Sequence, residues 1–370
     1  MSPDESSGGQ AASHNEPDQL PILVSPTTGG KGKNTIRMEL IPIACWRVDD
    51  VRFAFASSFL LPRVKKEFAE LNALRNKHKN CPLSVFGHAD PTGDDVFNKK
   101  LAGHRAESIY AILIRDTGRW ERLFNDGKSV EGWGIRSIQE MCNALGHPAG
   151  LVDGLDGPQT QAGVKSFQKQ KKLTQDGIAG PNTRKELFAA YMDFLCSFTV
   201  AKTEFLGQDT DSGGKAALQG CGEFNPTLVF SQEQQKNFAD TAKKPERDAE
   251  NVVNRRVMIL LFRPGTTVAI NKWPCPRVDE GVERCHLRFW SDGDHRRNPQ
   301  AKARKFSETQ DTFACRFYHR LVTLSPCEGA PPAKIVYQWI QLRLLGRPQT
   351  NPESWWPKTD PVQYPNEPFT

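Results

Sequence analysis

Hydrophobic residues between positions 41 and 79 change from a strand-like to a helix-like spacing. Val51, Phe53 and Phe55 stand at every second position, which is the period of a strand. Pro62 then opens a stretch in which apolar residues recur every three or four positions, as on one face of a helix. These residues are Val64, Phe68, Leu71 and Leu74. The pattern predicts a strand followed by an amphipathic helix.

A second strand and helix follow, and a third pair comes much later. Leu83, Val85 and Phe86 predict a short strand that runs into the polar turn 87–93. The next helix carries an apolar stripe formed by Leu101, Ala102, Ile109, Ile112 and Leu113. Farther on, a charged helix is expected over 232–252, and the apolar run 257–262 predicts another strand. This order predicts one α/β layer domain that is interrupted in the middle.

The interruption contains an internal repeat. The residues Asp153-Gly-Leu-Asp-Gly-Pro-Gln-Thr160 return, 23 positions later, as Asp176-Gly-Ile-Ala-Gly-Pro-Asn-Thr183. Asp-Gly favours a turn, and a proline fits the first turn of a helix, so each copy is expected to start a short helix. Apolar residues before, between and after the copies then give three helices around one core: Ile138, Cys142, Leu145, Val164, Phe167, Leu187 and Tyr191. We expect a small all-α unit of about sixty residues, near the lower size limit for independent folding.

The two ends of the chain differ from its middle. Residues 1–34 are rich in Ser, Gly, Pro and Asn and predict a disordered leader, and residues 348–370 predict an extended Pro-rich tail. The only apolar run of the leader, 20–24, contains Pro21 and is too short for a secretory signal peptide. No stretch approaches the ~20 apolar residues of a membrane helix, so we do not expect an integral membrane protein. The net charge of +6 gives no indication of a nucleic-acid partner.

The turn after the second strand carries a recognisable signature. It resembles that of the OmpA-like peptidoglycan-associating domain, in the segments Gly87-His88-Ala89-Asp90-x-x-Gly93, Asn98, Leu101 and Arg105-Ala106-Glu107-Ser108. Two later blocks also resemble that family: Gly220–Pro226 and the Asn-Arg-Arg-Val sequence ending at Val257. The resemblance implies an α+β two-layer sandwich made of residues 35–118 and 215–263. One departure is Ala89, where the family commonly has Thr.

The repeated segment resembles a second family. Its two Asp-Gly-x-x-Gly-Pro-x-Thr copies are similar to the three-helix peptidoglycan-binding domain of the PG_binding_1 type, which is often joined to cell-wall hydrolases. This resemblance covers about residues 133–192, and the inserted domain is expected over 130–195. Together the two resemblances imply that an OmpA-like domain is split by a second wall-binding domain, inserted at a loop where insertion is tolerated.

The OmpA-like resemblance also implies a ligand, the diaminopimelate of peptidoglycan stem peptides, whose side chain ends in one ammonium and one carboxylate group. Asp90 can accept hydrogen bonds from the ammonium group, while Arg105 offers a planar pair of donors to the carboxylate. Asn98, near the start of the same helix, could complete carboxylate binding. Arg255 is a further candidate, because it starts the closing strand on the same side.

A purely structural interpretation competes with each of these assignments. An Asp and an Arg fifteen residues apart are often a surface ion pair worth about 0–1 kcal/mol, and only their place in the whole signature favours binding. Asp153, Asp156 and Asp176 fit turn formation better than ligand contact. Trp133 and Phe167 fit a core better than a sugar-binding platform.

Nine cysteines are present, and four of them follow the α/β domain. Residues 264–347 are expected to form a Cys-containing domain of unknown fold, with Cys275, Cys285, Cys315 and Cys327. They could form disulfides, with Cys275–Cys285 as one pairing, or remain free thiols. Their spacing lacks the C-x-x-C pair of common zinc sites, so we expect no metal, and a four-cysteine zinc site is the weaker alternative. No cofactor is expected.

The sequence therefore predicts a non-catalytic peptidoglycan-binding protein. A hydrolase or a secretion-delivered effector, with its activity in the C-terminal segment, is one alternative, and a structural component of an envelope or injection machine is another. No H-E-x-x-H or G-x-S-x-G motif is present, and the S-x-x-K match at 212–215 lies in a Gly-rich connector without its companion motifs. We expect action at the cell wall or in the periplasm after export by an unknown route, with possible envelope or secretion-machine partners, and a cytoplasmic location otherwise.

Overall fold

The computed structural model describes residues 23–24, 36–37 and 40–323, except for 55, 127–132, 229, 231, 283–284, 286–288 and 292–312. The chain divides into two compact units, residues 1–40 and 41–370. In the first unit, β1 (Leu23–Val24) pairs antiparallel with β2 (Ile36–Arg37). The rest of the predicted leader, the predicted tail 348–370 and Cys327 lie outside the described residues.

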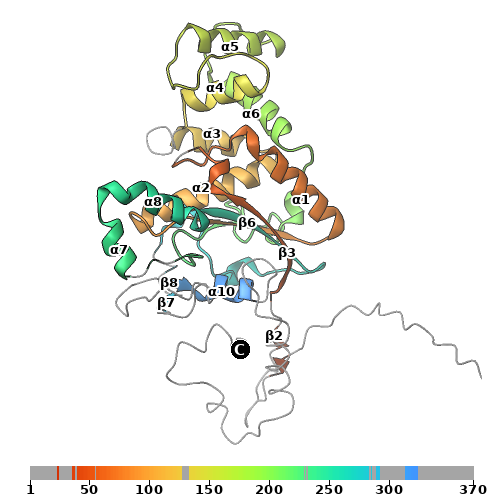
Figure 1. Ribbon diagram of the computed structural model, residues 1–370. Coiled ribbons are helices and arrows are strands. Elements are labelled where there is room, and N and C mark those ends of the chain that lie inside the picture. The colour runs from red at the N-terminus through yellow and green to blue at the C-terminus, as the bar shows by residue number, and fades with distance from the viewer. Residues whose placement is uncertain are drawn as a thin grey trace, which may run out of the picture. The chain divides into compact units, whose positions relative to one another are not determined.

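The second unit contains a four-stranded sheet in the order β3-β6-β4-β5. Its neighbouring strands β3 and β6 are labelled in Figure 1. Its strands are β3 (Pro42–Asp49), β4 (Leu83–His88), β5 (Leu218–Gly220) and β6 (Arg256–Phe262). The β4–β5 pair is parallel and the other two pairs are antiparallel. Every residue of β6 is buried, because this strand lies inside the sheet and both of its faces are covered, which explains its continuous apolar run.

Two helices pack on the sheet. The helix α1 (Lys65–Lys77) follows a short 3-10 turn η2 (Pro62–Val64) and contacts β3, where the indole of Trp46 donates to the carbonyl of Glu67 at 2.7 Å. The helix α2 (Asp95–Ile114) lies against β4 and β5. A β-carbon on Gly87 would lie 1.8 Å from the carbonyl oxygen of Ala102, so only glycine permits this close approach.

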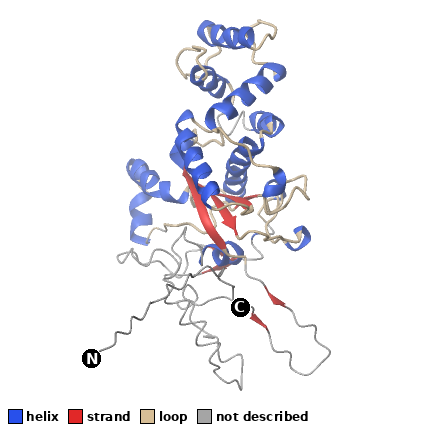
Figure 2. Cartoon of the chain, turned by 90° about the vertical axis from the view of Figure 1, so that its right-hand side faces the viewer, coloured by secondary structure: helices blue, strands red, loops and turns tan. Residues whose placement is uncertain are grey.

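The described residues between α2 and β5 form helices joined by turns and loops, with no named strand among them; Figure 2 draws these helices in blue. The three predicted helices are present as α4 (Ile135–Ala144), α5 (Pro158–Gln170) and α6 (Pro181–Leu195). We call these three helices and their connecting turns the three-helix module. Their predicted core residues are buried, apart from the partly buried Leu145. The predicted mixed α/β fold with an all-α interruption is therefore confirmed.

One helix of the interruption was not predicted. The helix α3 (Thr117–Asp126) follows α2 directly and packs against both α2 and α6. Its Trp120 is fully buried and donates from the indole nitrogen to the carbonyl of Ser108 in α2 at 3.1 Å. This helix therefore attaches the three-helix module to the α/β layer.

Aromatic residues join the three-helix module to the loop before α1. Phe59 stacks on Tyr191 with 5.7 Å between ring centroids, and meets the edge of Trp133 at 5.2 Å. The Tyr191 hydroxyl donates to the carbonyl of Leu60 at 3.0 Å, and the Trp133 indole donates to the Ser58 hydroxyl at 2.9 Å. Trp133 and Phe167 are buried, so both belong to the core, in agreement with the structural interpretation.

Two predicted elements are wrong in their position or length. The first strand is β3, not the alternating residues 51–55: Asp50–Arg52 form a 3-10 turn, and Val51 is 45% exposed. The ladder ends at Asp49 because its partner strand begins opposite it, at Arg256.

The single helix expected over 232–252 is broken into α7 (Gln232–Phe238), a 3-10 turn η4 (Thr241–Lys243), α8 (Lys244–Glu250) and a 3-10 turn η5 (Asn251–Asn254). Pro245 explains the break, since it cannot occupy the interior of a helix but fits the first turn of α8.

Described residues after position 263 pack on the α/β layer. Successive residues of a strand face opposite sides, so Phe86 and His88 face away from α2, which Gly87 contacts. On that opposite side the ring of Tyr318 lies 5.3 Å from Phe86 and 4.5 Å from His88. The elements after position 263 are η6 (Ile270–Lys272), η7 (Val278–Glu280), β7 (Phe289–Ser291), β8 (Phe313–Cys315) and α10 (Arg316–Thr323).

The domain boundaries at 264 and 347 remain predictions. Among the described helices, none is both long enough and apolar enough to cross a bilayer.

Candidate functional site

Asp90 lies just beyond the end of β4, at the turn predicted to hold it. Its Oδ1 atom accepts a hydrogen bond from the backbone N–H of Thr92 at 2.9 Å, which fixes the turn. Its Oδ2 atom lies 2.6 Å from Nη1 of Arg255, and the Asp90 side chain remains 13% exposed. Asp90 therefore presents a partly exposed carboxylate that is already paired with one cation.

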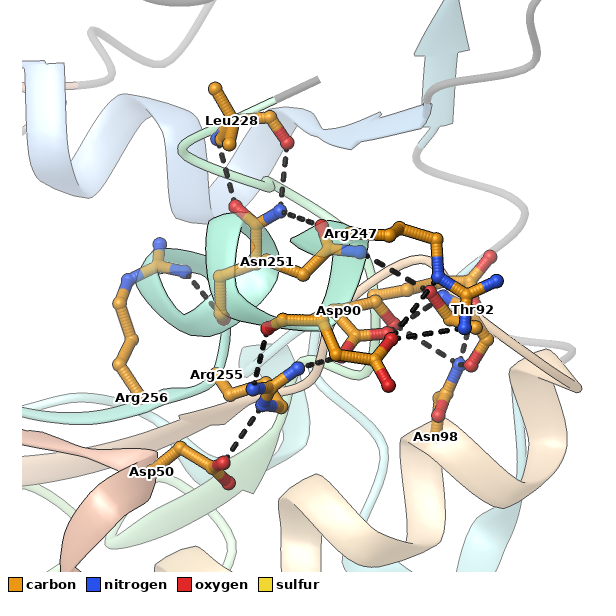
Figure 3. A network of polar contacts seen from close by, with 12 residues as sticks. Asp50, Asp90, Thr92, Asn98, Leu228, Arg247, Asn251, Arg255 and Arg256 are labelled. Atoms are coloured by element: carbon orange, nitrogen blue, oxygen red, sulfur yellow. Dashed lines mark hydrogen bonds and ion pairs between the residues drawn. The ribbon is translucent and has the colours of Figure 1, made fainter. Parts of the chain in front are cut away.

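Arg255 is held between two carboxylates, as Figure 3 shows. Its Nε atom donates to Asp50 at 2.8 Å, its Nη1 atom to Asp90, and its Nη2 atom to the carbonyl of Asp248 at 3.1 Å. Burial alone would lower the pKa of Arg255, but the hydrogen bonds and charges of Asp90 and Asp50 outweigh it and raise that pKa above its ordinary value. The guanidinium group is permanently charged and fixed in orientation.

Arg105 does not face Asp90, which corrects the predicted geometry. Its side chain is only 2% exposed, and its Nη2 atom lies 2.6 Å from Oδ1 of Asp50. Its Nε atom donates to the carbonyl of Ser57 at 2.9 Å, and its guanidinium lies 5.0 Å from the centre of the Phe53 ring. Arg105 lies in the second half of α2, beside the loop that follows β3, whereas Asp90 precedes the first turn of that helix. Asp90 and Arg105, which were expected to bind the two ends of one ligand, are therefore each paired with another residue: Asp90 with Arg255 and Arg105 with Asp50.

The four charged groups form a chain in which acid and base alternate: Asp90, Arg255, Asp50 and Arg105. Asp50 joins the two arginines, because its two carboxylate oxygens pair with different guanidinium groups. Sequence reasoning missed Asp50, since it lies outside the quoted signature and meets Arg255 only across 205 residues of chain. The charges of these four groups sum to zero. A zwitterionic ligand can therefore bind among them without leaving an unpaired buried ion.

Asn98 uses its amide nitrogen within the protein. It lies 3.2 Å from the carbonyl of Asp90, 3.1 Å from that of Thr92 and 2.8 Å from Oε2 of Glu223. Asn98 is 4% exposed and thereby ties the Asp90 turn to the loop after β5. Asn98 therefore has a structural role in holding the site together. Its contact with a ligand carboxylate remains a prediction.

Glu223 adds a second carboxylate near Asp90. Burial raises the pKa of Glu223 above its ordinary value of 4.5, the hydrogen bond from Asn98 opposes this rise, and the negative charges of Asp95, Asp90 and Asp94 add to it. The sequence contained a signal for Glu223, since it stands in the Gly220–Pro226 block, but no role was assigned to it. The Asp90 side of the chain is therefore rich in carboxylates and suited to a cation.

The first repeated turn of the three-helix module is organised by one buried glutamine. Gln139 of α4 donates to Oδ1 of Asp153 at 2.8 Å, the carbonyl of Leu155 at 3.1 Å and the hydroxyl of Thr160 at 2.9 Å. Its carbonyl oxygen accepts from the N–H of Gly154 at 2.9 Å. The hydrogen bond from Gln139, followed by that from the N–H of Leu155, lowers the pKa of Asp153.

The second turn repeats this network with Gln168 of α5. The amide of Gln168 donates to Asp176 at 2.7 Å, to the carbonyl of Ile178 at 3.1 Å and to Thr183 at 3.1 Å, and it accepts from Gly177 at 2.9 Å. The polar residues shared by the two copies of the motif thus hold the turns together. This agrees with the turn-forming interpretation of Asp153 and Asp176.

The described cysteines hold no metal-binding arrangement. Cys275, Cys285 and Cys315 form no disulfide, so the Cys275–Cys285 pairing that the sequence left open is absent. Cys45 takes part in a disulfide. Within the part of the chain that the structure describes, no three His, Cys, Asp or Glu side chains are grouped so that they could hold a metal ion.

Comparisons with known proteins agree with part of this picture. Residues 131–187 match the family model PG_binding_1, a peptidoglycan binding domain. The chain is 33% identical over 104 residues to a zinc D-Ala-D-Ala carboxypeptidase of Streptomyces albus G, covering 26% of this chain and 39% of that protein. It is 37% identical over 62 residues to the N-acetylmuramoyl-L-alanine amidase CwlM of Mycobacterium tuberculosis, covering 17% and 15%. It is also 30% identical over 67 residues to outer membrane porin F of Pseudomonas fluorescens, covering 18% and 21%. The chain thus spans well under half of the length of each of these relatives.

Proposed function

We propose that this chain is a non-catalytic peptidoglycan-binding protein with two binding units, the three-helix module and the α/β layer. The match of residues 131–187 to a peptidoglycan binding domain carries the general function. For the α/β layer we propose an OmpA-like domain that recognises diaminopimelate. The chain of alternating charges from Asp90 to Arg105 supports this finer assignment, as does the partial similarity to an outer membrane porin.

The two ends of a diaminopimelate side chain match two places in that chain of charges. Its ammonium group would meet Asp90, with Glu223 as a second acceptor nearby. Its carboxylate would take the position that the Asp50 carboxylate occupies between the guanidinium groups of Arg255 and Arg105. Charge-assisted hydrogen bonds of this kind are the strong class, and a guanidinium group can bind a carboxylate through two parallel donors.

Exchange of the Asp50 carboxylate for the ligand carboxylate would avoid a large electrostatic penalty. Removing Asp50 without replacement would leave the buried guanidinium group of Arg105 uncompensated, which is costly. A ligand carboxylate that replaces Asp50 keeps both guanidinium groups paired while Asp50 turns to solvent. Asp50 is already 20% exposed, so the path to solvent is short.

Sedimentation with purified sacculi tests this function with the full chain. We expect the protein to pellet with sacculi that contain diaminopimelate, and to pellet less with sacculi that contain lysine instead, because lysine lacks the side-chain carboxylate. Free diaminopimelate should compete only for the share of binding that depends on Asp90. Equal pelleting with both kinds of sacculi would contradict diaminopimelate recognition, and no pelleting with either would contradict peptidoglycan binding.

A wall-cleaving enzyme is the second candidate, because two of the partial relatives are named as a carboxypeptidase and an amidase. Under this alternative, the activity would reside in the segment after residue 263. Incubation of the purified chain with sacculi separates the two candidates: a binder releases no soluble muropeptides, whereas a hydrolase does.

We further propose that the chain acts at the cell wall or in the periplasm, delivered by an export route that involves other envelope or secretion-machine proteins. Peptidoglycan as the ligand is the reason for this location. Fractionation of intact cells, followed by detection of the chain in each fraction, tests it. A chain confined to the cytoplasm at all growth stages would contradict the proposal.

A further inference from the structure

The two repeated turns of the three-helix module leave equivalent side chains exposed. Leu155 and Ile178 occupy the same position in the two copies and are 67% and 65% exposed. Each has a fixed backbone: its N–H donates to the turn aspartate, at 2.8 Å and 2.9 Å, and its carbonyl accepts from the turn glutamine. Both aliphatic side chains are thus presented from a rigid backbone, although neither is needed for the core.

A cation accompanies each of these side chains at an equivalent place. Arg136 stands three residues before Gln139, and Lys165 stands three residues before Gln168, and both are exposed. A β-carbon on the turn glycine would lie 3.0 Å from Cγ of Arg136 in the first copy and 3.0 Å from Cε of Lys165 in the second. The long side chains therefore lie over their turns, and each turn combines one aliphatic group with one cation.

We infer that these two turns are the peptidoglycan contacts of the three-helix module, and that each turn binds a stem peptide. The inference rests on the proposed peptidoglycan binding and identifies the residues responsible. A stem peptide carries free carboxylates, which complement Arg136 and Lys165, and alanine methyl groups, which can be buried against Leu155 and Ile178. Single exposed aliphatic residues are common on protein surfaces, but an exposed aliphatic residue at the same position of both copies, each beside a cation, points to a shared function.

The repetition of the site suits a repetitive ligand. Both turns lie beside α5: the side-chain amide of Gln161 lies 3.4 Å from the carbonyl of Asp156 in the first turn, and a β-carbon on Gly177 in the second turn would lie 3.2 Å from the carbonyl oxygen of Gln161. Stem peptides recur along the wall polymer, so two of them can be bound by one module. Binding at the second turn is then favoured by the high local concentration that the first contact creates.

The test uses the full chain with Asp90→Asn, so that the α/β layer contributes little to binding. Into this background we introduce Leu155→Ser and Ile178→Ser together with Arg136→Glu and Lys165→Glu. We expect pelleting with sacculi to weaken by at least about tenfold, a factor equal to about 1.4 kcal/mol. Lys185→Glu, an exposed charge reversal on α6, is the matched control and should leave pelleting unchanged.

The outcomes separate this inference from the proposed function. If wild type fails to pellet, peptidoglycan binding itself is wrong. If wild type pellets but the four substitutions change nothing, or Asp90→Asn alone removes all pelleting, the turns are not the contacts. Glycan strands stripped of their stem peptides should not be bound, and retained binding to them would also overturn the inference. Should the fourfold variant lose its helical circular dichroism, the two variants of a single turn, each with two substitutions, give the same test.

Discussion

The Nη1 atom of Arg255 lies 2.6 Å from Oδ2 of Asp90, although 165 residues separate them in the chain. Strand pairing produces this contact: His88 stands opposite Arg256, so the residues just beyond β4 and just before β6 meet. The sheet register, rather than any ligand, therefore sets the geometry of the pair. Substitutions in the pair are accordingly expected to affect binding more than folding.

Replacement of Asp90 should remove most of the binding by the α/β layer. Asp90→Asn keeps the shape and the acceptor for Thr92 but deletes the negative charge. Loss of a charge-assisted hydrogen bond, worth about 1.5–3 kcal/mol, predicts about ten- to hundredfold weaker binding of free diaminopimelate by calorimetry. Asp209→Asn, at an exposed turn position with positive φ that Asn tolerates, should bind like wild type. Equal affinities for the two variants would count against Asp90.

Replacement of Asp50 should have the opposite effect on binding. Asp50→Asn removes the carboxylate that competes with the ligand for Arg105 and Arg255, so affinity for diaminopimelate should rise. The free protein should lose about 1–3 kcal/mol of stability, because the buried Arg105 loses its charged partner. Urea unfolding with and without ligand measures both effects. Asp49→Asn, which alters a half-exposed neighbour paired with Arg47, is the control. Unchanged or weaker affinity in Asp50→Asn would contradict the exchange.

The raised pKa of Glu223 predicts a specific dependence of stability on pH. In the folded state this carboxyl group holds its proton to a higher pH than in the unfolded state, where its pKa is near 4.5. Its contribution to stability is therefore fully present below pH 4.5 and is lost as the pH rises through the folded pKa. Glu223→Gln should be more stable than wild type above that range and equal to it in acid. Thermal unfolding over a pH series measures the difference, and two parallel curves would contradict this account.

Close packing of α2 on β4 makes Gly87 irreplaceable. In Gly87→Ala the new methyl group would collide with the carbonyl oxygen of Ala102, and backbone cannot move aside as a flexible side chain can. We expect a loss of about 3 kcal/mol or more in free energy of unfolding. Gly180→Ala, where nothing lies within 4 Å of a β-carbon, should cost no more than about 1 kcal/mol. Similar losses in both variants would argue against the close approach.

Local patterns predicted most of the elements but not all of their limits. The apolar run of β6 and the stripe of α2 were sufficient, because burial on a sheet or along a helix leaves a direct periodic trace. The alternation of Val51, Phe53 and Phe55 was misleading, since the end of β3 depends on where its partner strand begins. The helix α3 was not predicted, although its buried Trp120, Leu123 and Phe124 stand at the three- and four-residue steps of a helix.

The sequence indicated which residues lie together at the candidate site better than it indicated which of them contact one another. Asp90, Asn98, Arg105 and Arg255 all belong to one connected network, as their common signature indicated. Their partners could not be inferred, because Asp50 meets Arg255 only through the pairing of β3 with β6. A spacing of fifteen residues between Asp90 and Arg105 fixes their separation along the chain but not the direction in which each side chain points.

The aromatic junction of Phe59, Trp133 and Tyr191, with its hydrogen bonds to Ser58 and Leu60, has a mechanical consequence. It holds the three-helix module against the loop between β3 and α1, so the two proposed binding units keep a fixed distance and orientation. Under the proposed function, both units can therefore bind at once only where the groups they recognise lie at that same spacing in the wall polymer.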